Sequence, residues 1–263
     1  MSRTEATTRS IATTRTDSSA RTDRGAYSVP IDLINIGVNH YWDFRTAKLE
    51  TDQRSVADLI GMRGMQFRGN SSLSSLYPSA AYFADLERSN NDYFGTSPYR
   101  LATAVTSISY FAWIKRESTG AIHHILADWE TSGNQRGSRI YLTSDVFEMT
   151  ISSNGTSNTS YTSTETLTDT ASWHCIVITY DTTNRCVMTL DGVDLTVTLT
   201  AGSHPSTINS SNIAKLIGAN LPSAPANFFD GLIGICGICV NRALSTSEKA
   251  SLRDITNKLG SYV

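Results

Sequence analysis

Residues 172–192, SWHCIVITYDTTNRCVMTLDG, carry the pattern that decides the fold of this chain. A Trp-led run of alternating character leads to a turn at Asp181–Asn184, and a second run closes on Asp191–Gly192. Alternation with a period of two on either side of a short turn predicts a β-hairpin, with a tight turn after it. Pairing of Tyr180 with Arg185 across the first turn is the register that we expect.

A second informative segment, residues 228–252, reads FFDGLIGICGICVNRALSTSEKASL. Its first half is a β-rich run with three glycines, and an Asn-Arg-Ala-Leu-Ser step then leads into a helix. Ser245 and Glu248 have the spacing of a capping box, which marks a helix start. Leu252, Ile255 and Leu259 fall on roughly one side of that helix.

Together the two segments resemble the laminin-G-like, concanavalin-A-like jelly-roll family, whose members show a similar Trp-led hairpin and a similar closing Asn-Arg-Ala-Leu segment. Residues 40–69 and 90–116 resemble two further blocks of the family, so that four blocks in the family's order cover residues 39–255. The resemblance implies an all-β, antiparallel two-sheet jelly-roll sandwich with a short C-terminal helix. One departure is Leu86-Glu87-Arg88, where the family often has Phe-Asp-Gly.

Two parts of the chain differ in composition, and we expect residues 1–29 to form an extended arm and residues 30–263 to form the jelly-roll domain. The arm has almost no large apolar residues and cannot build a core. Arg3, Arg9, Arg15 and Arg21 recur every six residues. An extended chain would place all four on one face, so we predict that they bind a partner.

Hydrophobic periodicity predicts further elements within the sandwich. We expect strands at 31–36, 41–44, 105–116, 122–129, 139–143, 146–152 and 193–200, the last with one wet face. Ser55 to Asp58 has the pattern of a helical turn. The Ser/Thr-rich stretch 150–170 predicts a polar hairpin or loop.

The composition of the chain limits the classes of partner that it is expected to bind. A formal net charge of −2 on 263 residues gives no broad electrostatic case for binding nucleic acid or an acidic membrane. The chain has no uninterrupted apolar run of about 18 residues, so we expect no membrane span. The first ten residues lack the apolar region of a secretory signal. We therefore expect synthesis in a cytoplasm and export as part of an assembled particle.

The four cysteines give no sign of a bridge or a metal site. In the expected register Cys175 and Cys186 lie roughly 13 Å apart, too far for a disulfide. Cys236 and Cys239 point to opposite faces of one strand, and no second ligand pair for zinc follows. We predict four reduced, packed thiols, no metal and no cofactor.

Catalytic constellations are also missing. Glucanase relatives of this fold carry Glu-x-Asp-x-x-Glu on one strand, and no such triplet occurs. The nearest pair that we identify, Asp145 and Glu148, would face opposite ways. His123 and His124 are expected to be strand residues, one inward and one outward. We predict no catalytic residue and a protein that is not an enzyme.

Two positions are candidates for ligand contact. Asn91 and Asp92 match a family step at which calcium ligands occur, and the alternative is that Asp92 only shapes the turn before Tyr93. Trp42, Trp113 and Trp173 belong to core blocks. Trp129 lies beside a Gly-rich loop, so we predict that it is exposed and is a candidate carbohydrate-binding residue.

A sandwich of this family with a low-complexity arm is similar to accessory virion proteins of tailed bacteriophages. The resemblance implies a non-enzymatic capsid decoration protein, anchored through its arm to a major capsid or tail protein and forming a homo-oligomer. One alternative is a tail adsorption or carbohydrate-binding module for a host surface glycan. A second alternative is a glycan-cleaving enzyme.

Overall fold

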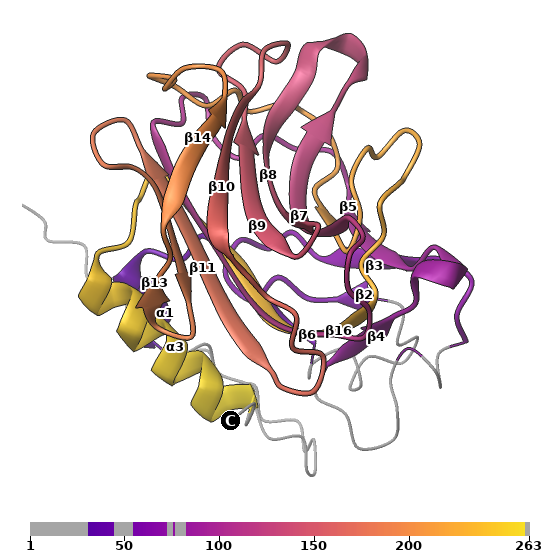
Figure 1. Ribbon diagram of the computed structural model, residues 1–263. Coiled ribbons are helices and arrows are strands. Elements are labelled where there is room, and N and C mark those ends of the chain that lie inside the picture. Colours follow the sequence, from indigo (N-terminus) through magenta and orange to yellow (C-terminus); the bar gives the residue numbers. More distant parts are fainter. Residues whose placement is uncertain (1–30, 45–54, 73–75, 77–82, 261–263) are drawn as a thin grey trace, which may run out of the picture.

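The computed structural model describes residues 31–44, 55–72, 76 and 83–260, which form two antiparallel β-sheets packed face to face (Figure 1). This confirms the two-sheet sandwich predicted from the sequence. The arm, with Arg3, Arg9, Arg15 and Arg21, lies outside the described residues. No helix among the described residues is long and apolar enough to cross a membrane.

Sheet A, as far as the chain is described, has seven strands in the order β1-β16-β6-β11-β12-β13, with β4 also paired to β16. Its strands are β1 (His40–Asp43), β4 (Ala84–Leu86), β6 (Ser107–Arg116), β11 (His174–Asp181), β12 (Arg185–Leu190), β13 (Val193–Asp194) and β16 (Gly231–Val240).

Sheet B, within the same ranges, has nine strands in the order β14-β10-β9-β8-β7-β15-β5-β3-β2. Its strands are β2 (Ser55–Val56), β3 (Met65–Arg68), β5 (Tyr93–Thr96), β7 (His123–Glu130), β8 (Gln135–Thr143), β9 (Val146–Ile151), β10 (Thr159–Thr166), β14 (Val197–Ala201) and β15 (Leu216–Ile217). The helices are α1 (Ile31–Ile36) and α3 (Thr246–Gly260), and short 3₁₀ turns are η2 (Arg88–Asn90) and η3 (Ser132–Asn134).

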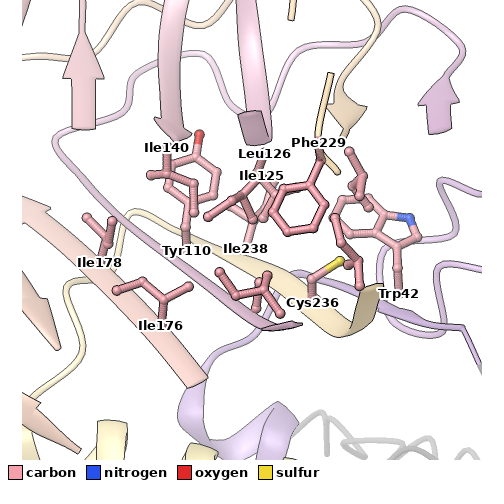
Figure 2. Packing of buried hydrophobic residues seen from close by; sticks show 14 of the residues in the cluster. Trp42, Tyr110, Ile125, Leu126, Ile140, Ile176, Ile178, Phe229, Cys236 and Ile238 are labelled. Atoms are coloured by element: carbon pink, nitrogen blue, oxygen red, sulfur yellow. The ribbon is translucent and has the colours of Figure 1, made fainter. Parts of the chain in front are cut away.

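The main hydrophobic core fills the space between the sheets (Figure 2). Tyr110, Ile176 and Ile238 project into it from sheet A, and Ile125 and Ile140 project from sheet B. Burial of such side chains stabilises by about 1.5–3 kcal/mol each. Trp42 and Trp113 are both buried, as predicted.

The outer face of sheet A is also buried, because α1 and α3 pack on it (Figure 1). Phe111 and Val177 of the sheet meet Leu33 and Leu252 of the helices in a second core. The predicted capping box of α3 is present: the backbone N–H of Ser245 donates to Glu248 Oε2 at 2.8 Å, and that of Glu248 donates to Ser245 Oγ at 3.4 Å. The described part of the chain therefore forms three layers, with α1 and α3 together on the outer side of sheet A.

The hairpin β11–β12 is confirmed, but its register differs by one residue from the prediction. Asp181 pairs with Arg185, so that Cys186 faces Tyr180 rather than Thr179. The side chain of Asp181 shapes the turn by accepting hydrogen bonds from the backbone N–H groups of Thr183 and Asn184. Because Asp181 itself pairs with Arg185, the turn is one residue shorter than predicted. The four cysteines are unbridged and buried, as predicted.

The segment 31–36 is a helix and not the predicted strand. Leu33 and Ile36 are buried and lie one helical turn apart. The backbone N–H of Gly37 bonds to the Ile34 carbonyl and that of Val38 bonds to the Leu33 carbonyl, which is a Schellman motif. Gly37 has a φ of 87°, a left-handed conformation that favours glycine at this position.

Two further expectations are corrected. Ser55–Val56 is a strand paired with Gln66 and Met65, and not a helical turn. The stretch 193–200 is not one strand, because β13 pairs with β12 in sheet A whereas β14 pairs with β10 in sheet B. Leu195 marks the crossing, since its N–H donates to Met188 of sheet A, while the carbonyl of Thr196 accepts from Thr164 of sheet B.

Candidate functional site

The outer face of sheet B is the sheet face that α1 and α3 leave open (Figure 1). Alternation along its strands fixes which residues lie there, because Phe147, Met149 and Tyr161 belong to the inner core. The residues between them, such as Glu148 and Thr162, therefore face outward.

A stack of buried side chains occupies the middle of this face. The Arg139 guanidinium lies over the rings of Trp129 and Tyr141, at 4.5 and 4.7 Å from their centroids. The ring of His124 stacks on that of Tyr141, with centroids 4.7 Å apart. Burial and the charge of Arg139 hold the pKa of His124 well below its usual value, so that this histidine is neutral.

The prediction that Trp129 is exposed is wrong. Its side chain is 1% exposed, because Arg139 covers its ring and the segment after β15 crosses its strand, where the N–H of Leu221 donates to the Trp129 carbonyl. A sugar ring therefore has no open face of Trp129 on which to stack. The two adjacent histidines do differ in direction, yet both are buried: His123 packs on Phe229 of the core and His124 on the outer stack.

Beside this stack the open face of sheet B holds a shallow groove of about 340 Å³. We call it the Tyr93 groove. It is lined by Arg68, Gly69, Asn70, Asn91, Tyr93, Pro225 and Phe228. It combines two aromatic rings, two amide side chains and one guanidinium.

The strands β3 and β5 place these groups. Arg68 pairs with Tyr93, while their neighbours Phe67 and Phe94 face the inner core. The ring of Phe228 reaches over from the segment before β16, and its centroid lies 6.0 Å from that of Tyr93. Burial raises the pKa of Tyr93, although Arg68 opposes this, so the phenol stays protonated and can donate a hydrogen bond.

Asp92 is buried next to Gly69 and does not line the groove. Its Oδ1 accepts hydrogen bonds from the backbone N–H groups of Asn70 and Ser71, and its Oδ2 accepts one from Glu87. Gly69 is required here, since a Cβ on it would lie 2.2 Å from Asp92 Oδ1 and its φ is 138°. Of the two readings of Asp92, these contacts support the turn-shaping role and not calcium binding.

Comparison with known proteins bears on this geometry. The family model described as the concanavalin A-like lectin/glucanases superfamily matches residues 88–248. The chain belongs to this superfamily. A comparison with curated proteins found no match.

Among solved structures, the superfamily fold of this chain is similar to binding domains of botulinum neurotoxins. The binding domain of botulinum neurotoxin DC, in complex with rat synaptotagmin II, has 15% identity and a TM-score of 0.62, over 84% of this chain and 52% of that one. The serotype G binding domain has 15% identity and a TM-score of 0.58, over 84% and 51%. The chain spans about half the length of these structures, and the likeness shows the fold alone.

Glycoside hydrolysis by glucanases needs a pair of carboxylates, which makes the acidic residues of the strands relevant. Asp145 lies in the turn after β8, where its Oδ1 accepts from Arg116 at 2.6 Å, and Glu148 accepts a short hydrogen bond from Tyr141. The sequence analysis missed a closer pair on β7, Asp128 and Glu130. The Asp-Trp-Glu spacing was the signal for it.

Neither member of that closer pair is free for chemistry. Asp128 lies between the sheets, 2.9 Å from Lys215 Nζ, and burial raises its pKa to about 6 despite the charge of Lys215. Glu130 accepts hydrogen bonds from the backbone N–H groups of Thr131, Ser132 and Ser223. The strand bulge between Asp128 and Trp129 separates the two carboxylates into these different surroundings.

Three other carboxylates could hold a metal ion. One ligand atom each of Asp85, Glu87 and Glu117 lie within 4.8 Å of one another. Burial, together with the nearby charges of Glu117 and Glu87, raises the pKa of Asp85 to about 6. The sequence gives no sign that these three form a cluster, because they come from the ends of β4 and β6, which are far apart in the chain.

Proposed function

We propose that this chain is a non-enzymatic carbohydrate-binding module and that the Tyr93 groove is its saccharide site. The observation that carries the proposal is the combination, in one groove on the open sheet face, of aromatic rings, amides and a guanidinium. This corresponds to the alternative drawn from the sequence, the carbohydrate-binding module, with a different residue set in place of Trp129.

Each group in the groove suits part of a sugar. The apolar C–H face of a sugar ring packs on aromatic rings such as those of Tyr93 and Phe228. The side-chain amides of Asn70 and Asn91 both donate and accept hydrogen bonds, as sugar hydroxyls do. The volume of about 340 Å³ falls within the range of small-ligand sites, about 300–1,000 Å³.

The charge of Arg68 favours acidic saccharides as ligands of the groove. Arg68 is the single charged residue that lines the groove, and Asp92 is engaged with backbone amides. A guanidinium binds carboxylates through paired, charge-assisted hydrogen bonds. We therefore expect a sugar acid, as a uronate or a sialate, to bind more tightly than its neutral counterpart.

The comparisons support this proposal at the level of the fold. The description of the matching superfamily names lectins and glucanases. One similar structure, with 13% identity and a TM-score of 0.56 over 84% of this chain and 52% of that one, is a neurotoxin binding domain in complex with SialylT.

Titration calorimetry with acidic and neutral oligosaccharides tests the proposal. We expect Arg68→Ala to weaken binding of the acidic sugar by roughly 10- to 100-fold, the worth of about 1.5–3 kcal/mol for a charged hydrogen bond, and to leave weak neutral binding unchanged. Phe228→Ala should weaken both. Arg100→Ala, at an exposed arginine outside the groove, is the matched control. Wild-type binding that neither groove variant reduces would place the site elsewhere.

The virion location is a separate proposal that rests on the arm. We propose that residues 1–29 anchor the domain to a capsid or tail protein through Arg3, Arg9, Arg15 and Arg21. The likeness to binding domains favours host adsorption over capsid decoration. Deletion of residues 1–29 should abolish incorporation into particles without loss of saccharide binding, as measured on purified particles. Normal occupancy after the deletion would contradict arm anchoring.

A further inference from the structure

The strand β14 ends sheet B with an edge that no described strand covers. It pairs with β10 on one side, and it is the last strand of the sheet in the described part of the chain. Its residues, Val-Thr-Leu-Thr-Ala, carry no charge and no proline. Leu199 is 41% exposed.

The ladder shows which backbone groups of β14 point outward. The N–H of Thr164 donates to the carbonyl of Thr196, and Thr198 pairs with Thr162 two residues further along. In an antiparallel ladder the residues between such hydrogen-bonded pairs turn their N–H and C=O groups to the other side. The backbone groups of Val197 and Leu199 therefore face the open edge.

Within the described residues, β14 lacks the charges and prolines that oppose pairing with another strand. Natural edge strands usually carry charges, prolines or bulges that prevent it. The one bulge in β14 lies near its end, between Leu199 and Ala201. The nearest carboxylate before the strand, Asp194, is bound to Lys249 at 2.6 Å.

We propose that β14 pairs with β14 of a second copy of this chain about a two-fold axis. In the register centred on Thr198, Val197 and Leu199 each exchange backbone hydrogen bonds with Leu199 and Val197 of the second copy. Thr198 then lies directly opposite Thr198 of the second copy. This one register pairs every outward backbone group and also brings the exposed side chain of Leu199 next to a valine.

The pairing joins the two sheets B into one continuous sheet. A two-fold axis between antiparallel strands is perpendicular to the sheet, so both open faces lie on the same side of the dimer. Five residues per chain bury much less surface than a stable interface of about 1,200–2,000 Å², and we expect a weak, concentration-dependent dimer. If the proposed saccharide function is correct, the dimer presents two Tyr93 grooves to one surface and gains avidity.

Oxidative cross-linking tests the register. In the proposed dimer the Cα atoms of the two Thr198 residues lie about 4.5 Å apart, as in a non-hydrogen-bonded pair, within the disulfide range of about 4.4–6.8 Å. We expect Thr198→Cys to form a covalent dimer on mild oxidation, and Thr168→Cys, at an exposed position away from the edge, not to do so. The native cysteines are buried and add no background.

Introduced charges give a second, independent test, in which sedimentation velocity of the full chain measures the dimer. Thr198→Lys and Thr198→Glu should each be monomeric, because like charges would face each other, and a mixture of the two should dimerise. The same pair of substitutions at Thr168 should not alter the wild-type dimer. A wild-type monomer at all concentrations, or dimerisation only after deletion of residues 1–29, would overturn the proposal; the second result would identify the arm as the strand on this edge.

Discussion

Replacement of Asp58 by asparagine should destabilise the fold markedly, although it only replaces one carboxylate oxygen by an NH₂ group. The side chain is fully buried beside β1. Its Oδ1 accepts hydrogen bonds from the backbone N–H groups of Tyr41, Ile60 and Gly61, at 2.8–3.1 Å. Its Oδ2 accepts from the N–H of Arg63 at 3.1 Å and lies 2.6 Å from His40 Nδ1.

The magnitude follows from these contacts. An amide in the better orientation keeps its oxygen on the first three N–H groups and points its NH₂ at Arg63, whose N–H then has no acceptor. An unsatisfied buried donor costs about 1–3 kcal/mol. The three remaining bonds also lose their charge assistance, which roughly doubles the strength of such bonds. We expect a total loss of about 3 kcal/mol in the free energy of unfolding.

Urea unfolding of Asp58→Asn at neutral pH measures this loss. Asp254→Asn, at an exposed position on α3, is the control and should change stability by less than about 0.5 kcal/mol. Burial would raise the pKa of Asp58, but the bonds from His40, Tyr41 and Gly61 outweigh it and lower that pKa. The difference from wild type is therefore full above pH 3.8 and shrinks as the pH falls further. A loss below about 1 kcal/mol would refute the reasoning.

Three further predictions test other layers. Leu252→Ala removes a buried side chain between α3 and sheet A and should cost about 2–5 kcal/mol in urea unfolding, whereas Ser251→Ala should cost little. A hydrogen bond to Asp191 raises the pKa of His174, so the stability lost in His174→Gln should be full below pH 6.5 and decline as the pH rises through the raised value. The four cysteines should react with a thiol reagent only after unfolding, because all are buried.

The sequence predicted the hairpin and the helix α3 because both depend on local signals, and it predicted the two-sheet sandwich through the resemblance to the family. The turn before Arg185, the alternation in β11 and the Ser245–Glu248 spacing all act within a few residues. Register is less local. The side chain of Asp181 sets where the turn closes, and a one-residue difference moved Cys186 opposite a different partner.

What the sequence could not reveal depends on contacts between distant segments. The segment of α1 is rich in isoleucine, which favours a strand, yet the outer face of sheet A offers Leu33 and Ile36 a place to pack on one side of a helix. Trp129 precedes a polar, Gly-containing segment, yet Arg139 from the next strand covers it. The Tyr93 groove joins Arg68 to Phe228, which are brought together by the sheet and not by proximity in the chain.

The composition of the strands nevertheless indicates where binding can occur. Strands covered on both faces carry continuous apolar runs, as do residues 175–178 of β11 and nearly all of β16, which lie between the core and the helices. Strands with an open face alternate, as β10 and β14 do with Ser and Thr outward. The Ser/Thr-rich stretches that predict loops are therefore the marks of the open sheet. The groove and the free edge both belong to sheet B, whereas α1 and α3 pack on the outer face of sheet A and bury Phe111 and Val177 there.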